Sequence, residues 1–201
     1  MSPYSRLDDE EAESPPMGEP NAFLEEALFK ARTILLTGGI DFKQAKRVCE
    51  RLLALSSANP KEPILLVISS PGGHVESGDM IHDMIKFVTA PVKVLGTGWV
   101  ASAGALIYSA AKKENRFALK NTRFLLHEPR GGVGGQATDV EIQAREILKM
   151  RERLNNIFAD ATGKSLEQIK KDTDRDFWMS ADEAVKYGLV SKIVTHQGEI
   201  K

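Results

Sequence analysis

From residue 22 onward, apolar positions alternate between helical spacing and short continuous runs. Continuous runs predict strands over residues 33–37, 64–68, 92–95, 124–127 and 189–194. Between them, helical spacing predicts helices over residues 22–31, 41–55, 80–88, 103–112 and 138–162, with two shorter helices that begin at residues 165 and 180. The run over 64–68 is typical of a strand buried on both faces. Strands that alternate with helices predict an α/β fold with a largely parallel sheet.

Helix boundaries carry recognisable signals. An acidic or hydroxyl residue followed three positions later by Glu or Gln predicts a capped helix start at four places: Asp41 with Gln44, Thr138 with Glu141, Ser165 with Gln168, and Ser180 with Glu183. Gly163 and Gly188 each follow the last apolar position of a helix and predict its end.

Residues 1–21 differ in composition from the rest of the chain. They are acidic and proline-rich with few apolar side chains, so we expect a flexible arm that cannot bury enough surface to order itself. Residues 22–201 have no repeat and no long linker, which predicts one domain.

Charge and cysteine usage exclude several classes. The formal net charge is -1, which does not favour nucleic acid or anionic lipid as a partner. No apolar window is long enough to span a membrane, and the start does not resemble a signal peptide. The one cysteine, Cys49, falls in a predicted amphipathic helix, so we interpret it as a buried thiol in a cytoplasmic protein.

Ser102 lies where an apolar strand is followed by a helix. A serine there is well placed as a nucleophile, because the free N–H groups of the helix start can stabilise a developing oxyanion, and the N–H of Ala103 is the natural donor. The alternative is a plain helix cap, which position alone favours. Val100 stands where the G-x-S-x-G motif needs glycine, which counts against an α/β-hydrolase fold but not against a serine hydrolase.

Other residues offer chemistry with equally plain alternatives. His127 at a strand end is a candidate base or an ordinary histidine. Gly72 and Gly73 follow a strand and allow close backbone approach to a ligand, or only a turn. Residues 172–176 contain three aspartates, which suggest either a carboxylate that orients His127 or a solvated turn. A calcium loop is excluded, because Phe177 occupies the position that needs glycine. No metal site is expected.

Five stretches together resemble a known family. Residues 69–73, 101–104, 123–129, 135–139 and 172–180 closely resemble the proteolytic subunits of the Clp protease, the ClpP family, in the same order. The resemblance runs from about residue 34 to residue 194. It implies a ClpP/crotonase-like fold of repeated β-β-α units with a protruding strand–helix handle.

The resemblance also implies an activity and an assembly. The expected enzyme is a serine endopeptidase that hydrolyses unfolded proteins inside a chamber of two stacked seven-membered rings. An AAA+ unfoldase feeds the chamber and uses the ATP, so this chain needs no cofactor. The rings are either homomeric or shared with a second ClpP paralogue, and in the latter case this chain is a largely structural or regulatory subunit. A crotonase-type acyl-CoA enzyme and a membrane-bound serine–lysine peptidase fit the residues poorly.

Residue by residue, the resemblance implies the following roles. Ser102 matches the nucleophile, His127 the base and Asp176 the third triad member. Gly73 and Ala103 match the backbone donors of the oxyanion hole. Ring–ring contacts correspond to four residues: Gln136, Asp139, Asp174 and Arg175.

The chain departs from the family pattern at several positions. Trp99 and Val100 replace the usual glutamine and alanine, and Ala103 replaces methionine. Glu128 replaces glutamine and adds a negative charge beside the base. The N-terminal arm lacks the usual apolar start. These departures predict a divergent paralogue with an altered substrate groove.

Overall fold

The computed structural model describes residues 22–129 and 134–200. The predicted arm over residues 1–21 and most of the glycine-rich connector over 131–135 lie outside the described residues. The elements in chain order are α1 (Ala22–Lys30), β1 (Thr33–Thr37), α2 (Phe42–Ala58), β2 (Ile64–Ser70), α3 (Val75–Phe87), β3 (Val92–Ala101), α4 (Ala103–Ser109), η1 (Lys113–Asn115), β4 (Arg116–Ala118), β5 (Arg123–Leu126), α5 (Ala137–Thr162), α6 (Leu166–Thr173), β6 (Phe177–Ser180), α7 (Ala181–Tyr187), β7 (Lys192–Ile193) and η2 (Gln197–Glu199).

One sheet organises these elements. Strands β1, β2, β3, β4 and β7 follow one another in that order and are all parallel, as the alternating pattern predicts. Strand β3 changes partners along its length: residues 94–96 pair with β4, and residues 99–101 pair with β5. Strand β6 adds to β5 in the antiparallel direction. The carboxyl-terminal half of β3 therefore lies between the main sheet and a two-stranded extension.

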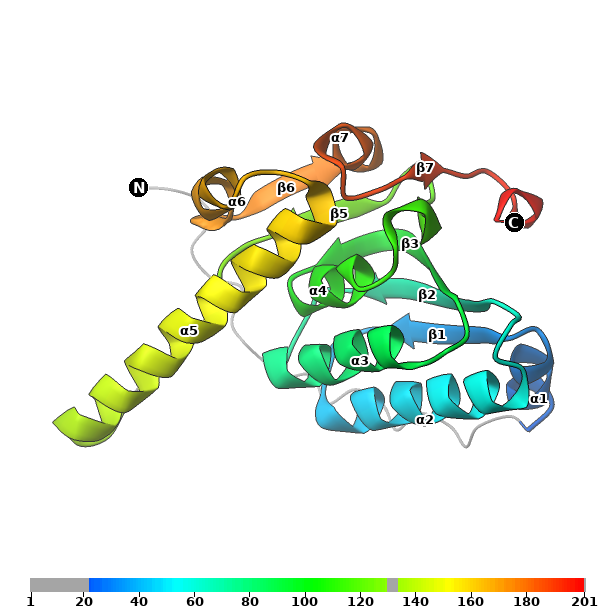
Figure 1. The fold of residues 1–201 in the computed structure, drawn as a ribbon, viewed down its shortest axis with the longest axis horizontal. Helices are drawn as coiled ribbons and strands as arrows, with labels where there is room; N and C mark the ends of the chain where they lie inside the picture. The colour runs from blue at the N-terminus through cyan, green and yellow to red at the C-terminus, as the bar shows by residue number, and fades with distance from the viewer. Residues whose placement is uncertain (1–21, 130–133, 201) are drawn as a thin grey trace, which may run out of the picture.

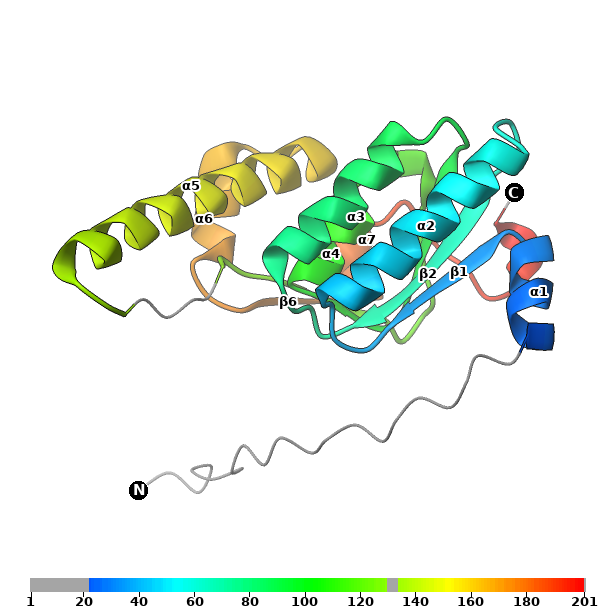
Figure 2. The same cartoon turned by 90° about the horizontal axis from the view of Figure 1, so that it is seen from below.

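Helices α2, α3 and α4 cover one face of the sheet (Figures 1 and 2). Their apolar sides meet the inward residues of the strands, among which Leu36, Leu66 and Val94 are fully buried. On β2 burial alternates, since Ile64, Leu66 and Ile68 are buried while the residues between them are only half-buried. The expectation that this run is buried on both faces is therefore wrong for the single chain, because helices cover only one side of this strand.

Several predicted boundaries are confirmed. Asp41 and Ser165 accept hydrogen bonds from the third residue of their helices, and Ser180 with Glu183 forms a complete capping box. Gly163 and Gly188 end α5 and α7 in the left-handed conformation.

Other predictions need correction. The capping box at Thr138 is wrong, because α5 begins at Ala137 and places Thr138 inside the first turn. Helix α4 is shorter than predicted and ends at Ser109, where the serine hydroxyl bonds back to the Leu106 carbonyl. Strand β3 is longer than predicted, since β5 supplies a new partner after the apolar run stops. Two short strands, β4 and β6, were not predicted, and the last strand is reduced to Lys192–Ile193.

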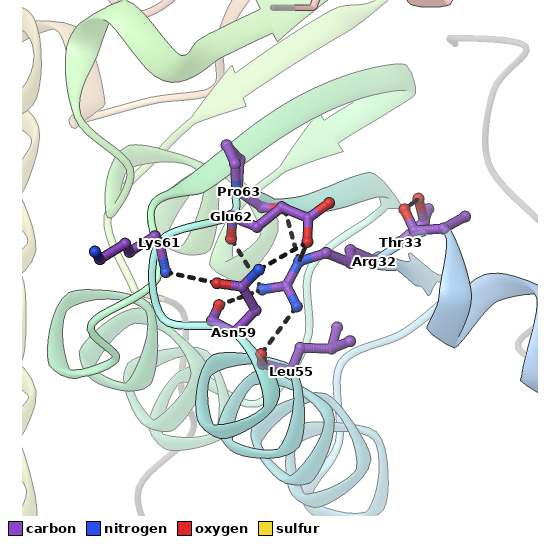
Figure 3. Close-up of polar contacts among 8 residues, drawn as sticks. Arg32, Thr33, Leu55, Asn59, Lys61, Glu62 and Pro63 are labelled. Carbon is purple, nitrogen blue, oxygen red and sulfur yellow. Dashed lines mark hydrogen bonds and ion pairs between the residues drawn. The ribbon is translucent and has the colours of Figure 1, made fainter.

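A buried arginine fastens the amino-terminal end of the sheet (Figure 3). Arg32 adopts a φ of 50°, and its guanidinium donates hydrogen bonds to four carbonyl groups, those of Leu55, Asn59, Glu62 and Pro63. These carbonyls belong to the end of α2 and the loop that leads into β2. The contacts tie the end of α2 to the start of β2, and they give the buried guanidinium hydrogen-bond partners.

Helix α5 is the longest element and projects well beyond the body of the molecule (Figure 1). Its carboxyl-terminal part packs on the core through Leu154 and Phe158, while Ile142 and Leu148 on its outer part are more than half exposed. Within residues 22–129 and 134–200, no helix combines the length and the apolar character that a bilayer span requires. The projecting helix corresponds in position to the helical part of the expected handle.

Candidate active site

Ser102 occupies the junction between β3 and α4 in a strained backbone conformation. Its φ of 55° and ψ of -122° are unfavourable for a residue with a side chain. The junction is held from both sides, because the Ser102 N–H donates to the Leu125 carbonyl at 3.0 Å and the Ser102 carbonyl accepts from Ala105 and Leu106. The Ser102 hydroxyl caps no helix N–H, so a plain cap does not explain this serine.

Gly72 and Gly73 lie directly against this junction. A Cβ atom on Gly72 would stand 2.5 Å from the Ser102 Cβ and 3.0 Å from its Oγ, so only glycine fits there. Gly73 forms a parallel bridge with Ile40, in which the flanking Gly72 carbonyl and His74 N–H make the hydrogen bonds. Because successive groups of an extended chain point to opposite sides, the Gly73 N–H faces away from Ile40.

The N–H of Ala103 is also outside the local backbone bonds. The first turn of α4 is closed by the N–H groups of Ala105 and Leu106, both of which donate to the Ser102 carbonyl. The first N–H groups of a helix have no partner within it. Gly73 and Ala103 thus each have a backbone donor available beside Ser102.

Strand register brings His127 to the same place. Ala101 pairs with Leu125, so Ser102 and His127 follow at the ends of neighbouring strands. Both residues line a small pocket, whose other walls are Val75, Ala103, Leu106, Pro129, Leu154 and Phe158. The His127 Nδ1 donates to the Glu128 carbonyl at 2.6 Å, which in the neutral ring leaves Nε2 as an acceptor.

Asp176 enters from the opposite strand of the extension. Leu126 pairs with Phe177 in the antiparallel ladder, so the next position along places Asp176 opposite His127. Asp176 is exposed, and the Nδ1 hydrogen that a triad carboxylate would accept goes to the Glu128 carbonyl instead. The backbone thus brings the two residues together, while the imidazole is bonded to its own chain.

A polar network that the sequence did not reveal supports the His127 segment. The Glu128 N–H donates to the Thr173 carbonyl at 2.8 Å, and the Thr173 hydroxyl donates to Asn155 of α5 at 2.9 Å. Asn155 and Thr173 are buried. The available signal was an amide side chain on the apolar face of the predicted long helix.

The charge that Glu128 adds is paired with a cation. Its carboxylate lies 3.2 Å from Arg151 on α5, so the acidic departure from the family pattern faces the projecting helix. The predicted ring-contact residues are exposed: Asp174 and Arg175 form a loose ion pair at 3.9 Å, and Gln136 and Asp139 lie at the start of α5.

The described residues contain no cluster of three or more His, Cys, Asp or Glu side chains arranged to hold a metal ion. Cys49 is buried, and this burial raises the pKa of its thiol to about 11. A thiol with that pKa is a poor nucleophile, so Ser102 is the stronger nucleophile candidate.

Comparison with known proteins points to one family. A family model described as Clp protease matches residues 18–197. The chain is 57% identical over 192 residues to "ATP-dependent Clp protease proteolytic subunit 3" of Rhizobium etli, covering 96% of this chain and 97% of the relative. It is 55% identical over 183 residues to proteolytic subunit 2 of Pseudomonas aeruginosa, covering 91% and 90%.

A solved structure gives the same result. A mutant of ClpP1 from Listeria monocytogenes matches with a TM-score of 0.83 and 52% sequence identity, covering 89% of this chain and 99% of that chain.

Proposed function

Because the chain belongs to the Clp protease family of serine peptidases, as an ATP-dependent Clp protease proteolytic subunit, we propose that it cleaves peptide bonds with Ser102 as its nucleophile. The observation that carries the proposal is the strained Ser102 backbone beside Gly72, in a pocket that His127 shares. Strain of this kind persists only where the surrounding structure enforces it, and it is concentrated at functional sites.

The proposed reaction uses His127 as the general base. Its Nε2 accepts the Ser102 proton as Oγ attacks the scissile carbonyl, and the imidazolium then donates that proton to the leaving amine. The N–H groups of Gly73 and Ala103 stabilise the oxyanion of the tetrahedral intermediate. A water molecule, activated by the same imidazole, hydrolyses the acyl-enzyme and restores the serine.

Asp176 completes the proposed triad once the hydrogen on His127 Nδ1 changes its acceptor. For the imidazole to be oriented by a carboxylate, the Nδ1 hydrogen passes from the Glu128 carbonyl to Asp176, the next register position of the β5–β6 ladder. A carboxylate in that place stabilises the imidazolium that forms during the reaction.

The wall beside Ser102 is mostly apolar, with Val75, Leu106, Leu154 and Phe158 among its residues. The hollow between them has room for about one water molecule, so a substrate side chain would lie across this wall rather than inside it.

The family implies a ring oligomer that works with a Clp ATPase. We propose two stacked rings of seven, with contacts through Gln136, Asp139, Asp174 and Arg175, and unfolded proteins delivered by an AAA+ unfoldase. The exposed apolar residues of α5 are consistent with burial in such an assembly.

Serine-directed fluorophosphonate labelling of the purified chain tests the proposal, with native mass measured in parallel. We expect labelling at Ser102 and loss of both labelling and peptidase activity in Ser102→Ala. A Ser57→Ala control at an exposed serine of α2 should change neither. Peptidase activity that survives Ser102→Ala contradicts the proposal. If labelling requires an added ClpP paralogue, the alternative of a regulatory subunit is favoured. The hydrogen bond from His127 Nδ1 to the Glu128 carbonyl would then explain why the chain alone is inactive, because it keeps the imidazole from Asp176.

A further inference from the structure

Three residues on neighbouring strands form an exposed aromatic–arginine cluster, which consists of Trp99, Arg123 and Trp178. Trp99 of β3 pairs with Arg123 of β5, which pairs with Ser180 of β6, two residues after Trp178. Trp99 is 44% exposed and Trp178 is 36% exposed. The alternate residues Val100, Phe124 and Met179 point into the core, so the cluster lies on the opposite face of the sheet.

The Arg123 guanidinium is held in place but has unused donors. Its central carbon lies 4.4 Å from the centroid of the Trp178 ring, a cation–π arrangement that fixes the plane of the group. Within residues 22–129 and 134–200, the Arg123 guanidinium makes no hydrogen bond and no ion pair, and its one side-chain contact of this kind is the Trp178 ring. Five N–H donors in a rigid fork match the two oxygens of a carboxylate.

The nearest acidic residues along β6 and α7 are already engaged. Glu183 accepts hydrogen bonds from the Ser180 N–H and hydroxyl, which hold the pKa of its carboxyl below the ordinary value. Asp182 pairs with Lys120 at 2.8 Å. The positive charge of Arg123 is therefore not neutralised by these carboxylates.

The cluster lies close to the nucleophile. Trp99 and Arg123 pair two positions before Ala101 and Leu125, the last ladder pair before Ser102. A strand rises about 3.3 Å per residue, so the backbone of Trp99 is about 10 Å from that of Ser102 along β3. Three residues of an extended peptide span that distance.

We propose that the aromatic–arginine cluster is a subsite that binds a carboxylate of the substrate chain about three residues from the scissile bond. This specificity role rests on the proposed peptidase function. Arg123 supplies a two-pronged hydrogen bond, and the Trp178 ring holds the plane of its guanidinium. An uncharged amide cannot accept both bonds, so the subsite discriminates glutamate from glutamine.

Binding can be measured without catalysis. The chain has two tryptophans, and both belong to the cluster, so intrinsic fluorescence reports directly on this surface. In the Ser102→Ala background, we would titrate amidated eight-residue peptides in which one Glu or Gln is moved from position to position. We expect a fluorescence change and binding about tenfold tighter for Glu than for Gln at one position. The difference should disappear with Arg123→Gln.

A matched variant separates this subsite from general charge effects. Lys120→Gln removes a nearby positive charge that is already paired with Asp182, and it should leave the Glu preference unchanged. Peptides with free and amidated C-termini distinguish a side-chain carboxylate from a chain-terminal one. Equal binding of Glu and Gln peptides at every position overturns the proposal.

Cleavage of peptides by the active protein provides an independent test. Arg123→Gln should lower kcat/KM for the Glu peptide about tenfold and leave the Gln peptide unaffected. If Arg123→Gln instead changes the native mass, this face is a contact between copies and the subsite proposal is wrong. Failure of Ser102→Ala to abolish cleavage would count against the proposed function alone, because the fluorescence result does not depend on catalysis.

Discussion

At the scale of single residues, the backbone of Ser102 carries the strain of the site. A φ of 55° costs energy for a residue with a Cβ atom, about 1–3 kcal/mol. The hydrogen bond to the Leu125 carbonyl holds this conformation in place, and Gly72 lies so close to Ser102 that a side chain at Gly72 would not fit. The position of the proposed nucleophile, Ser102, thus depends on a glycine that has no proposed role in the chemistry.

Gly72→Ala tests this dependence. The added methyl group would stand 2.5 Å from the Ser102 Cβ at a φ of 99°, so either the loop or the nucleophile has to move. We expect kcat/KM to fall about 100-fold, because a displacement of about 1 Å is enough to lose that much. Gly39→Ala is the matched control, since its methyl group meets nothing within 4 Å. Normal activity in Gly72→Ala would show that the site tolerates this displacement.

At the scale of elements, short segments are held by side-chain contacts that pattern alone does not show. The final turn η2 is one example. Glu199 accepts hydrogen bonds from the N–H and hydroxyl of Thr195, pairs with Lys192 at 2.9 Å, and so fastens the turn to β7. These hydrogen bonds and the lysine lower the pKa of the Glu199 carboxyl from 4.5 to about 2.

The depressed pKa predicts a pH dependence. A carboxyl whose pKa is lower in the folded state stabilises that state above its unfolded pKa, and the contribution is lost as the pH falls from about 4.5 toward 2. We therefore expect Glu199→Gln to lower Tm at pH 6, with a gap to the unmodified protein that narrows below pH 4.5. Glu167→Gln, at an exposed position of α6, is the control. A gap that stays constant down to pH 3 contradicts this assignment.

Sequence pattern predicted elements well where the local signals were complete. The capping box of Ser180 with Glu183 and the glycine end of α7 were correct, because each depends on residues within one turn. Strand β6 was missed because its four residues have no run of their own and exist as a strand only through pairing with β5. The box at Thr138 was wrong because the true N-cap, Gln136, lies two residues earlier, a shift that composition does not reveal.

At the scale of the whole molecule, α5 both supports the region around His127 and presents an apolar surface to solvent. Its inner half contacts Thr173 and Glu128, next to the His127 segment, through Asn155 and Arg151, while its outer half presents Ile142 and Leu148 to solvent. Exposed apolar residues on a projecting helix indicate a contact surface. Assembly through this helix would therefore connect the partner ring to the residues around His127.

Leu148→Asp tests the contact surface. Burying a carboxylate at an apolar interface is costly, so we expect the native mass to fall to half, as two rings separate. Lys149→Gln changes the net charge by the same amount at the neighbouring position and should leave the mass unchanged. An intact double ring in Leu148→Asp would show that Leu148 lies outside the interface.

By itself, the sequence determined the alternation of strands and helices, most helix ends, and the motifs that single out Ser102, His127, Asp176 and the Gly72–Gly73 pair. Those features depend on neighbouring residues or on recognisable short patterns. Tertiary structure decided which partners each strand takes, that Glu128 faces Arg151, that the His127 Nδ1 bonds to its own chain, and that the two tryptophans flank Arg123. These depend on strand register and on contacts between distant segments, which pattern along one chain cannot specify.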